Sequence, residues 1–263
     1  MDNVAPAEIV GSLVHMGEYK AKLAPKDLLI RGFLSGAILG LATVLAFTVA
    51  VQSGMPFVGA LAFPAGFAII IVMGYELVTG SFAAVPMAYL KGKVGLGALA
   101  RNWTFGFTGN LIGSLLFALL YYLYATKLGT SFGDPVLQRV IDVAESKTLA
   151  YSVQGASGYL VVFIKAVLCN WMVTMGVVMS LSSTSTLGKI VALWLPIFTF
   201  FALGLEHAVV NMFVVPAGIL LNADITVAGW WVWNQLPVTI GNIVGALLLT
   251  TLPLYLTYAR RSG

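Results

Sequence analysis

Long apolar runs dominate the chain, and polar residues gather between them. Six runs are long enough to cross a bilayer, which takes about 20 consecutive apolar residues per helix. They lie at about 28–51, 57–90, 103–125, 159–179, 190–221 and 228–258. Ahead of them, Ile9, Leu13 and Met16 recur at helical spacing, so we expect residues 1–27 to form an amphipathic helix at the membrane surface. The pattern predicts an all-α integral membrane protein, a single domain over 1–263.

The second and fifth runs are each interrupted by a short polar stretch. ELVTGS occupies 76–81 in the second run, and GLEH occupies 204–207 in the fifth. Backbone freed by such a break is tolerated within a membrane only where it is buried in protein or lines a wet cavity. We therefore expect transmembrane helices 2 and 5 to be broken, with a cavity at the breaks.

Short motifs also recur in the same order along the two halves of the chain. Gly74-Tyr-Glu76 returns as Gly204-Leu-Glu206, and GNLIG at 109–113 returns as GNIVG at 241–245. The first repeat, 28–126, and the second, 159–258, each hold three spans, and an odd number inverts the second relative to the first. Inverted repeats with one broken helix in each half predict a permeation site near the membrane midplane.

The composition is too apolar to cover a water-facing surface. The placement of the basic residues predicts how the chain is oriented in the membrane. Hydrophobic residues make up 59% of the chain and charged residues only 9%, whereas a soluble domain carries about 25% charged residues. The net charge of +4 does not indicate nucleic acid, because in a membrane protein basic residues mark the cytoplasmic side. That side has Lys20, Lys22, Lys26, Arg31, Lys91, Lys93, Arg101, Lys189, Arg260 and Arg261; the other has Lys127, Arg139 and Lys147. We expect a multi-pass protein of the cell membrane with both termini in the cytoplasm.

Glu206 and His207 are the only ionisable residues between Lys189 and Asp224. Ionisable groups inside a membrane are costly and indicate function. A histidine near a pore midpoint can give a hydrogen bond or a proton to an anion at ordinary pH; the alternative is a buried neutral imidazole bonded to a neighbouring helix. Glu76 and Glu206 would repel an anion, so we expect both to be structural, accepting hydrogen bonds from backbone N–H groups at the breaks.

Three further polar residues each admit two interpretations. Thr79 in the first break either bonds its own backbone or meets His207, because the pseudo-twofold brings the two breaks face to face. Lys165 either snorkels to the interface or concentrates anions in an outer vestibule. Asn170 either provides interhelical hydrogen bonds or lines the pore.

Aromatic residues precede the two breaks at comparable distances. Phe63, Phe67 and Phe200 either pack between helices or face the axis as dry constrictions on either side of His207, which a hydrated ion crosses poorly. Spacings typical of zinc, haem, phosphate-binding loops and catalytic triads are missing from the sequence. We therefore expect no cofactor, no metal and no enzymatic activity.

These motifs together resemble the formate–nitrite transporter family over nearly the whole chain. The residues that carry the resemblance are ELVTG at 76–80, NWTFGFTGN at 102–110, KAVLCNW at 165–171, GLEHAVVNMF at 204–213 and PVTIGN at 237–242. The resemblance implies an aquaporin-like fold in a homopentamer with one pore per protomer. It implies a channel or proton-coupled carrier for small monovalent anions, in the order formate, nitrite, then hydrosulfide or bicarbonate. The family roles map onto His207 as the central histidine, Thr79 as its partner, Lys165 as the vestibule base, Asn170 as a nearby polar group, and Phe63, Phe67 and Phe200 as constrictions.

Two other functions are compatible with the spans themselves. One is a passive pore for neutral solutes or water, in which His207 is structural. The other is a membrane sensor or scaffold that carries no flux. The paired breaks weigh against the scaffold, because it has no need to disrupt helices in lipid.

Overall fold

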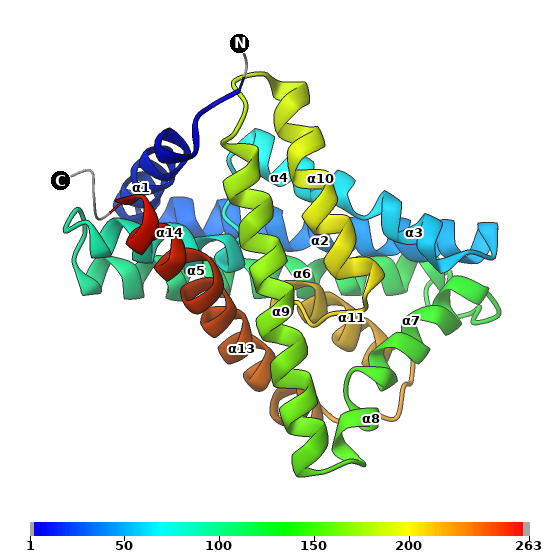
Figure 1. Ribbon diagram of the computed structural model, residues 1–263. Coiled ribbons are helices and arrows are strands. Elements are labelled where there is room, and N and C mark those ends of the chain that lie inside the picture. Colours follow the sequence, from blue (N-terminus) through cyan, green and yellow to red (C-terminus); the bar gives the residue numbers. More distant parts are fainter. Residues whose placement is uncertain (1–2, 260–263) are drawn as a thin grey trace.

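The computed structural model describes residues 3–259, and the regular structure in that part of the chain is helical, apart from an isolated bridge between Asn3 and Ser183. In chain order the helices are α1 (Pro6–Lys22), α2 (Pro25–Ser53), α3 (Pro56–Ala62), α4 (Pro64–Met73), α5 (Val78–Leu90), α6 (Leu96–Ala125), α7 (Pro135–Ser146), α8 (Leu149–Ser152), α9 (Ala156–Ser180), α10 (Thr186–Ala202), α11 (Ala208–Leu220), α12 (Val227–Trp230), α13 (Leu236–Ala246) and α14 (Leu252–Thr257). Single π-helical turns at Trp231–Gln235 and Leu247–Thr251 join α12, α13 and α14 into one long element. Figure 1 shows this arrangement.

Five apolar helical segments of the described chain are each long enough to cross a membrane: Pro25–Ser53, Pro56–Met73, Leu96–Ala125, Ala156–Ser180 and Val227–Thr257. The second apolar run stops at Met73 and resumes as α5, and the fifth stops at Ala202 and resumes as α11. The shorter pieces on either side of the second break (α10 and α11) do not reach that length alone. Both interruptions therefore fall where the polar stretches lie in the sequence.

A left-handed glycine follows the helix end at both breaks. Gly74 has a φ of 66° and Gly204 a φ of 59°, a conformation that costs glycine little because it has no Cβ. The next amide then reaches back across the helix end, from Tyr75 to the Ile70 carbonyl and from Leu205 to the Phe200 carbonyl, at 3.0 and 3.1 Å. This six-to-one bond is the Schellman closure of a helix C-terminus. The same local chemistry thus ends the helix in both halves.

Close packing of two helix pairs surrounds the breaks. α2 lies against α6 and α9 lies against α13, and each pair is in contact along much of its length. A Cβ at Gly113 would overlap the Phe33 carbonyl, and a Cβ at Gly245 would overlap the Val167 carbonyl. Small residues at these positions let the backbones approach, as is typical of helix pairs in membranes.

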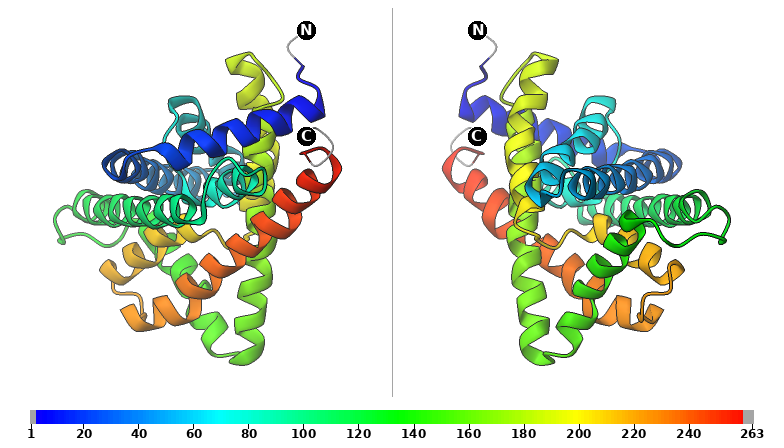
Figure 2. Two further views of the ribbon diagram at one scale, coloured as in Figure 1. Left: turned by 90° about the vertical axis from the view of Figure 1, so that its left-hand side faces the viewer. Right: turned by 90° about the vertical axis from the view of Figure 1, so that its right-hand side faces the viewer.

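The two ends of the molecule carry different short helices. α1 and α14 lie at one end and α7 and α8 at the opposite end, in Figure 1 and in both views of Figure 2. The apolar face of α1 packs on α5, where Val10 and Leu13 are buried. α7 was not expected from the sequence; it lies in the connection between α6 and α9 and packs on α11 and α2. Its course matters because it carries Arg139 and ends beside Lys147.

Candidate functional site

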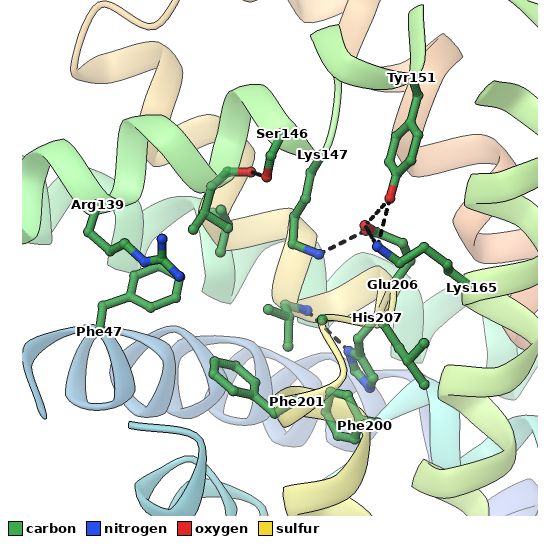
Figure 3. A pocket seen from close by; sticks show the side chains of 15 residues that line it. Phe47, Arg139, Ser146, Lys147, Tyr151, Lys165, Phe200, Phe201, Glu206 and His207 are labelled. Atoms are coloured by element: carbon green, nitrogen blue, oxygen red, sulfur yellow. Dashed lines mark hydrogen bonds and ion pairs between the residues drawn. The ribbon is translucent and has the colours of Figure 1, made fainter. Parts of the chain in front are cut away.

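Two cavities approach the breaks from opposite ends of the molecule. The α7 cavity has a volume of about 290 Å³, and its lining includes Arg139, Lys147, Lys165 and His207. The α1 cavity has a volume of about 160 Å³, and its lining includes Lys20 and, near the first break, Leu77 and Gly80. Figure 3 shows the side chains that line the α7 cavity. Glu206 and His207 of the second break line the α7 cavity, and Glu76 of the first break lines the α1 cavity.

Thr79 and His207 meet where the two broken helices face each other. The Thr79 Oγ1 and His207 Nε2 atoms are 3.1 Å apart, and both residues are buried. Because the Val210 amide donates to His207 Nδ1 at 3.2 Å, Nδ1 is an acceptor and the proton of the neutral ring resides on Nε2. The ring therefore donates to Thr79, whose own hydroxyl proton has no acceptor in the described part of the chain. The pairing of Thr79 with His207 is thus present in the structure.

The three phenylalanines predicted near the breaks are all buried, but they occupy different places. Phe200 stacks on the His207 ring, with centroids 5.5 Å apart, and lines the α7 cavity. Phe67 lines the α1 cavity. Phe63 lines neither of these cavities and packs edge-on against Phe200 at 5.5 Å. Phe201, which the sequence analysis did not single out, stacks on Phe63 at 4.1 Å and lines the α7 cavity.

Two asparagines from the following helices hold the N-termini of the half-helices. Asn110 accepts from the Val78 amide at 2.9 Å and donates to the Gly32 and Glu76 carbonyls, both at 2.8 Å. Asn242 repeats all three bonds: it accepts from the Ala208 amide at 2.9 Å and donates to the Ala166 carbonyl at 2.8 Å and the Glu206 carbonyl at 2.9 Å. Asn110 therefore ties the first break to α2, and Asn242 ties the second break to α9.

The prediction that Glu76 and Glu206 accept backbone N–H groups at the breaks is wrong. Asn110 and Asn242 take that role, because an amide side chain offers an acceptor and donors at once, whereas a carboxylate only accepts. A break exposes both N–H and C=O groups, so one asparagine satisfies both kinds. Both carboxylates lie at the breaks, but their partners are side chains.

Glu206 is the centre of a buried charged network at the floor of the α7 cavity. Its carboxylate is 1% exposed and accepts hydrogen bonds from Lys147 at 2.9 Å, Tyr151 at 2.8 Å, Asn211 at 2.8 Å and Asn234 at 3.3 Å. Lys165 Nζ lies 4.0 Å from Glu206 and donates to the Tyr151 hydroxyl at 3.1 Å. Tyr151 lies in α8, outside the apolar spans, where burial and the charge of Glu206 raise its pKa. The phenol therefore stays protonated and donates to the carboxylate.

Glu76 has a smaller set of partners at the α1 cavity. It accepts from Lys20 Nζ at 2.8 Å and from the Ser81 hydroxyl at 3.3 Å. This ion pair fastens α1 to the first break, because Lys20 lies in the last turn of α1. The carboxylates do not form a metal centre: over residues 3–259, His, Cys, Asp and Glu side chains form no group of three able to hold an ion.

Asn170 and Lys165 occupy different surroundings. Asn170 is buried and donates to the Thr79 carbonyl at 3.1 Å and to the Asn242 carbonyl at 2.6 Å. It therefore braces the first break against α13, and it lines neither the α7 nor the α1 cavity. Lys165 does line the α7 cavity, with a third of its side chain exposed (33%).

The sequence carried a signal for some of the site residues that were missed. Asn110 and Asn242 lie in the repeated GN motif, so their repetition at the breaks was visible, although their partners were not. Lys147 and Tyr151 lie in the connection between the repeats and resemble ordinary loop residues. Their place beside Glu206 depends on how α7 and α8 dock.

Replacing Asn110 by Leu should lower the free energy of unfolding by about 3 kcal/mol. The change removes three hydrogen bonds of about 1 kcal/mol each and leaves buried backbone groups unpaired. Thermal unfolding in detergent measures the loss. Gln154→Ala is the matched control, because the exposed Gln154 side chain donates only to the Ala150 carbonyl one turn away. Equal melting temperatures for the two variants would contradict the role of Asn110.

Comparisons with known proteins agree along almost the entire chain. A family model described as formate/nitrite transporter matches residues 7–256. The chain is 31% identical to the formate channel FocA of Escherichia coli (strain K12), over 99% of this chain and 96% of that protein. A solved FNT family ion channel superposes with a TM-score of 0.82 at 27% identity, covering 95% of this chain and 98% of the other. A pentameric formate channel with formate bound superposes with a TM-score of 0.74 at 26% identity, covering 90% and 98%.

Proposed function

The chain belongs to the formate/nitrite transporter family, and from this premise we propose that it carries small monovalent anions, formate first and nitrite next, through a pore in each protomer. It is a multi-pass membrane protein and a transporter rather than an enzyme. The observation that carries the proposal is the contact between Thr79 and His207. His207 lines the α7 cavity, and Gly80, next to Thr79 in the chain, lines the α1 cavity; each cavity has lysine in its lining.

The ends of the half-helices support an anion at the centre. α5 and α11 both begin at the breaks, and a helix N-terminus carries partial positive charge and free N–H groups. The first amide of each half-helix is bonded to an asparagine. The second amides, of Thr79 and Val209, have no hydrogen-bond partner within the described residues. These donors, with the Thr79 hydroxyl, would serve an anion as it passes.

His207 would help the anion to take up a proton midway. A bare charge in hydrocarbon costs several kcal/mol even on the milder scales, so the buried rings of Phe200 and Phe67 are crossed more easily by the neutral acid. The Nε2–H of His207 points to Thr79 and would hydrogen-bond the cargo directly or through the Thr79 hydroxyl. The proton that neutralises the anion then comes from water in the cavity, because loss of the single proton of the neutral ring would leave an imidazolate. Transport should then increase as the pH falls, because protons become available to the anion.

The orientation, the internal symmetry and the assembly complete the proposal. The excess of basic residues places the end with α1 and α14 in the cytoplasm, so the α7 cavity is the outer vestibule, with Lys165 as a base in it. The matching hydrogen bonds of Asn110 and Asn242 at the two breaks support two inverted three-helix repeats in an aquaporin-like arrangement. The solved relative that is a pentameric formate channel supports a homopentamer. Hydrosulfide and bicarbonate are further candidate substrates.

Purified protein in proteoliposomes should take up formate or nitrite in a saturable manner, faster at about pH 5.5 than at about pH 7.5, because more protons are available to the anion at the lower pH. Formate, nitrite, hydrosulfide and bicarbonate are compared with glycerol and water, and empty liposomes measure leak of the neutral acids. Glycerol or water flux without any anion preference would contradict the proposal and indicate the neutral-solute pore.

A further inference from the structure

Arg139 is a half-buried cation at the rim of the α7 cavity. Its guanidinium carbon lies 5.9 Å from the centre of the Phe47 ring. A ring contact of this kind uses the charge of the guanidinium but occupies none of its five N–H donors. No ion pair or side-chain hydrogen bond joins Arg139 to another residue of 3–259. Its donors are therefore available to a group that enters the cavity.

The acidic residues nearest to Arg139 in the chain accept hydrogen bonds from other residues. Asp134 caps α7 by accepting from the Val136 amide, Asp142 accepts from Gln138, and Glu145 accepts from the Asp224 amide. Within the cavity lining, the single carboxylate is Glu206, which pairs with Lys147 at 2.9 Å. Within the described residues, Arg139 therefore has no carboxylate partner.

The charge of the cavity lining is strongly positive. Arg139, Lys147 and Lys165 face one carboxylate, Glu206. Because Lys147 is closest to that carboxylate, the uncompensated charge resides on Arg139 and Lys165. Figure 3 shows the guanidinium of Arg139 and the ammonium of Lys147 on either side of open space, with Glu206 beyond Lys147. A concave, walled surface of one sign concentrates the opposite ion.

We propose that Arg139 forms an entry site in the α7 cavity that selects planar anions with two oxygen atoms. Arginine holds its donors in a rigid fork that matches two oxygens side by side, whereas lysine is a point charge without that geometry. Formate and nitrite present two such oxygens, but hydrosulfide and chloride present a single acceptor atom. This site deepens the proposed function and rests on it, since it assigns the choice of substrate to a residue away from His207.

Arg139→Lys keeps the charge and removes the fork, and it is the decisive variant. Uptake into proteoliposomes should show a rise of about tenfold in the half-saturation concentration of formate and nitrite, because two parallel charge-assisted bonds become one. The half-saturation concentration of hydrosulfide should stay within about twofold. If the wild type does not carry hydrosulfide, its inhibition constant against formate uptake takes the place of its flux. Lys127→Asn, which removes an exposed cation at the same end outside the cavity, should leave all three anions unchanged.

Two outcomes would overturn the entry site. Formate, nitrite and hydrosulfide all unchanged in Arg139→Lys would show that the fork is not used, and equal weakening of all three would show that Arg139 acts without regard to anion shape. Arg139→Gln is the second variant in case Arg139→Lys fails to assemble; it should weaken all three anions, formate and nitrite the most, and an equal loss would again overturn the site. If the wild type itself takes up none of these anions, the proposed function fails instead.

Discussion

Replacing His207 by Phe should lower formate uptake by about 100-fold, the lower end of what one positioned hydrogen-bond donor contributes, and should abolish the increase of carrier-mediated uptake at acidic pH. A phenyl ring is close in size to the imidazole that stacks on Phe200, so the change mainly removes the donor that faces Thr79. What persists should be the slow leak of the neutral acid, which also rises at acidic pH and is subtracted with empty liposomes. Uptake of labelled formate into proteoliposomes across a range of pH measures both effects.

Thr79→Ser is the matched control for His207→Phe. Serine keeps the hydroxyl that lies 3.1 Å from His207 Nε2 and removes only a methyl group, so flux and its pH dependence should stay close to those of the wild type. Size-exclusion profiles of both variants show whether the assembly is intact. Undiminished, pH-sensitive anion flux in His207→Phe would rule out the role of the histidine as hydrogen-bond donor to the anion.

Replacing Glu206 by Ala should lower the free energy of unfolding by about 3–5 kcal/mol, the usual cost of removing one partner from a buried ion pair. The variant leaves Lys147, whose side chain is 12% exposed, without its carboxylate. It also leaves the amide groups of Asn211 and Asn234 without that acceptor. Thermal unfolding in detergent, followed by loss of the assembled species, measures the change.

Surface ion pairs provide the comparison for Glu206. Glu18 and Lys22 form a pair at 2.6 Å within α1, and Lys22 is 69% exposed, so solvent screens their attraction. Glu18→Ala should melt as the wild type does. If Glu206→Ala has the same melting temperature as the wild type, the network in the α7 cavity does not contribute to stability.

Helix positions and the two breaks could be predicted from the sequence because both follow from local properties. Apolar length sets a span, and a left-handed glycine before a polar stretch ends a helix, so Gly74 and Gly204 mark the breaks. The contact of Thr79 with His207 was one of two interpretations of Thr79 in the sequence, and it follows if the repeated motifs bring the two breaks face to face. These features depend on short segments and on the repeated motifs alone.

The remaining parts of the site depend on tertiary docking, which short segments do not encode. α7 brings Lys147 and Arg139 to the cavity from a connection that reads as an ordinary loop. Glu206 was expected to accept backbone N–H groups because a carboxylate in the path would repel an anion. Its actual partners arrive from α8, α9 and α11, and from the turn before α13. The backbone at the breaks is satisfied instead by Asn110 and Asn242, from a full helix further along the chain.

The hydrogen bond from the Val210 amide to His207 Nδ1 also limits how protons can travel. A histidine passes protons along a chain of hydrogen bonds only when one ring nitrogen receives a proton while the other nitrogen releases one. Here the helix end occupies Nδ1, so the neutral ring has a donor at Nε2 but no free nitrogen to accept a second proton. We expect the ring to hydrogen-bond its cargo without passing on protons that arrive without an anion. A cell could then keep such a pore open without dissipating the proton gradient that drives its ATP synthesis.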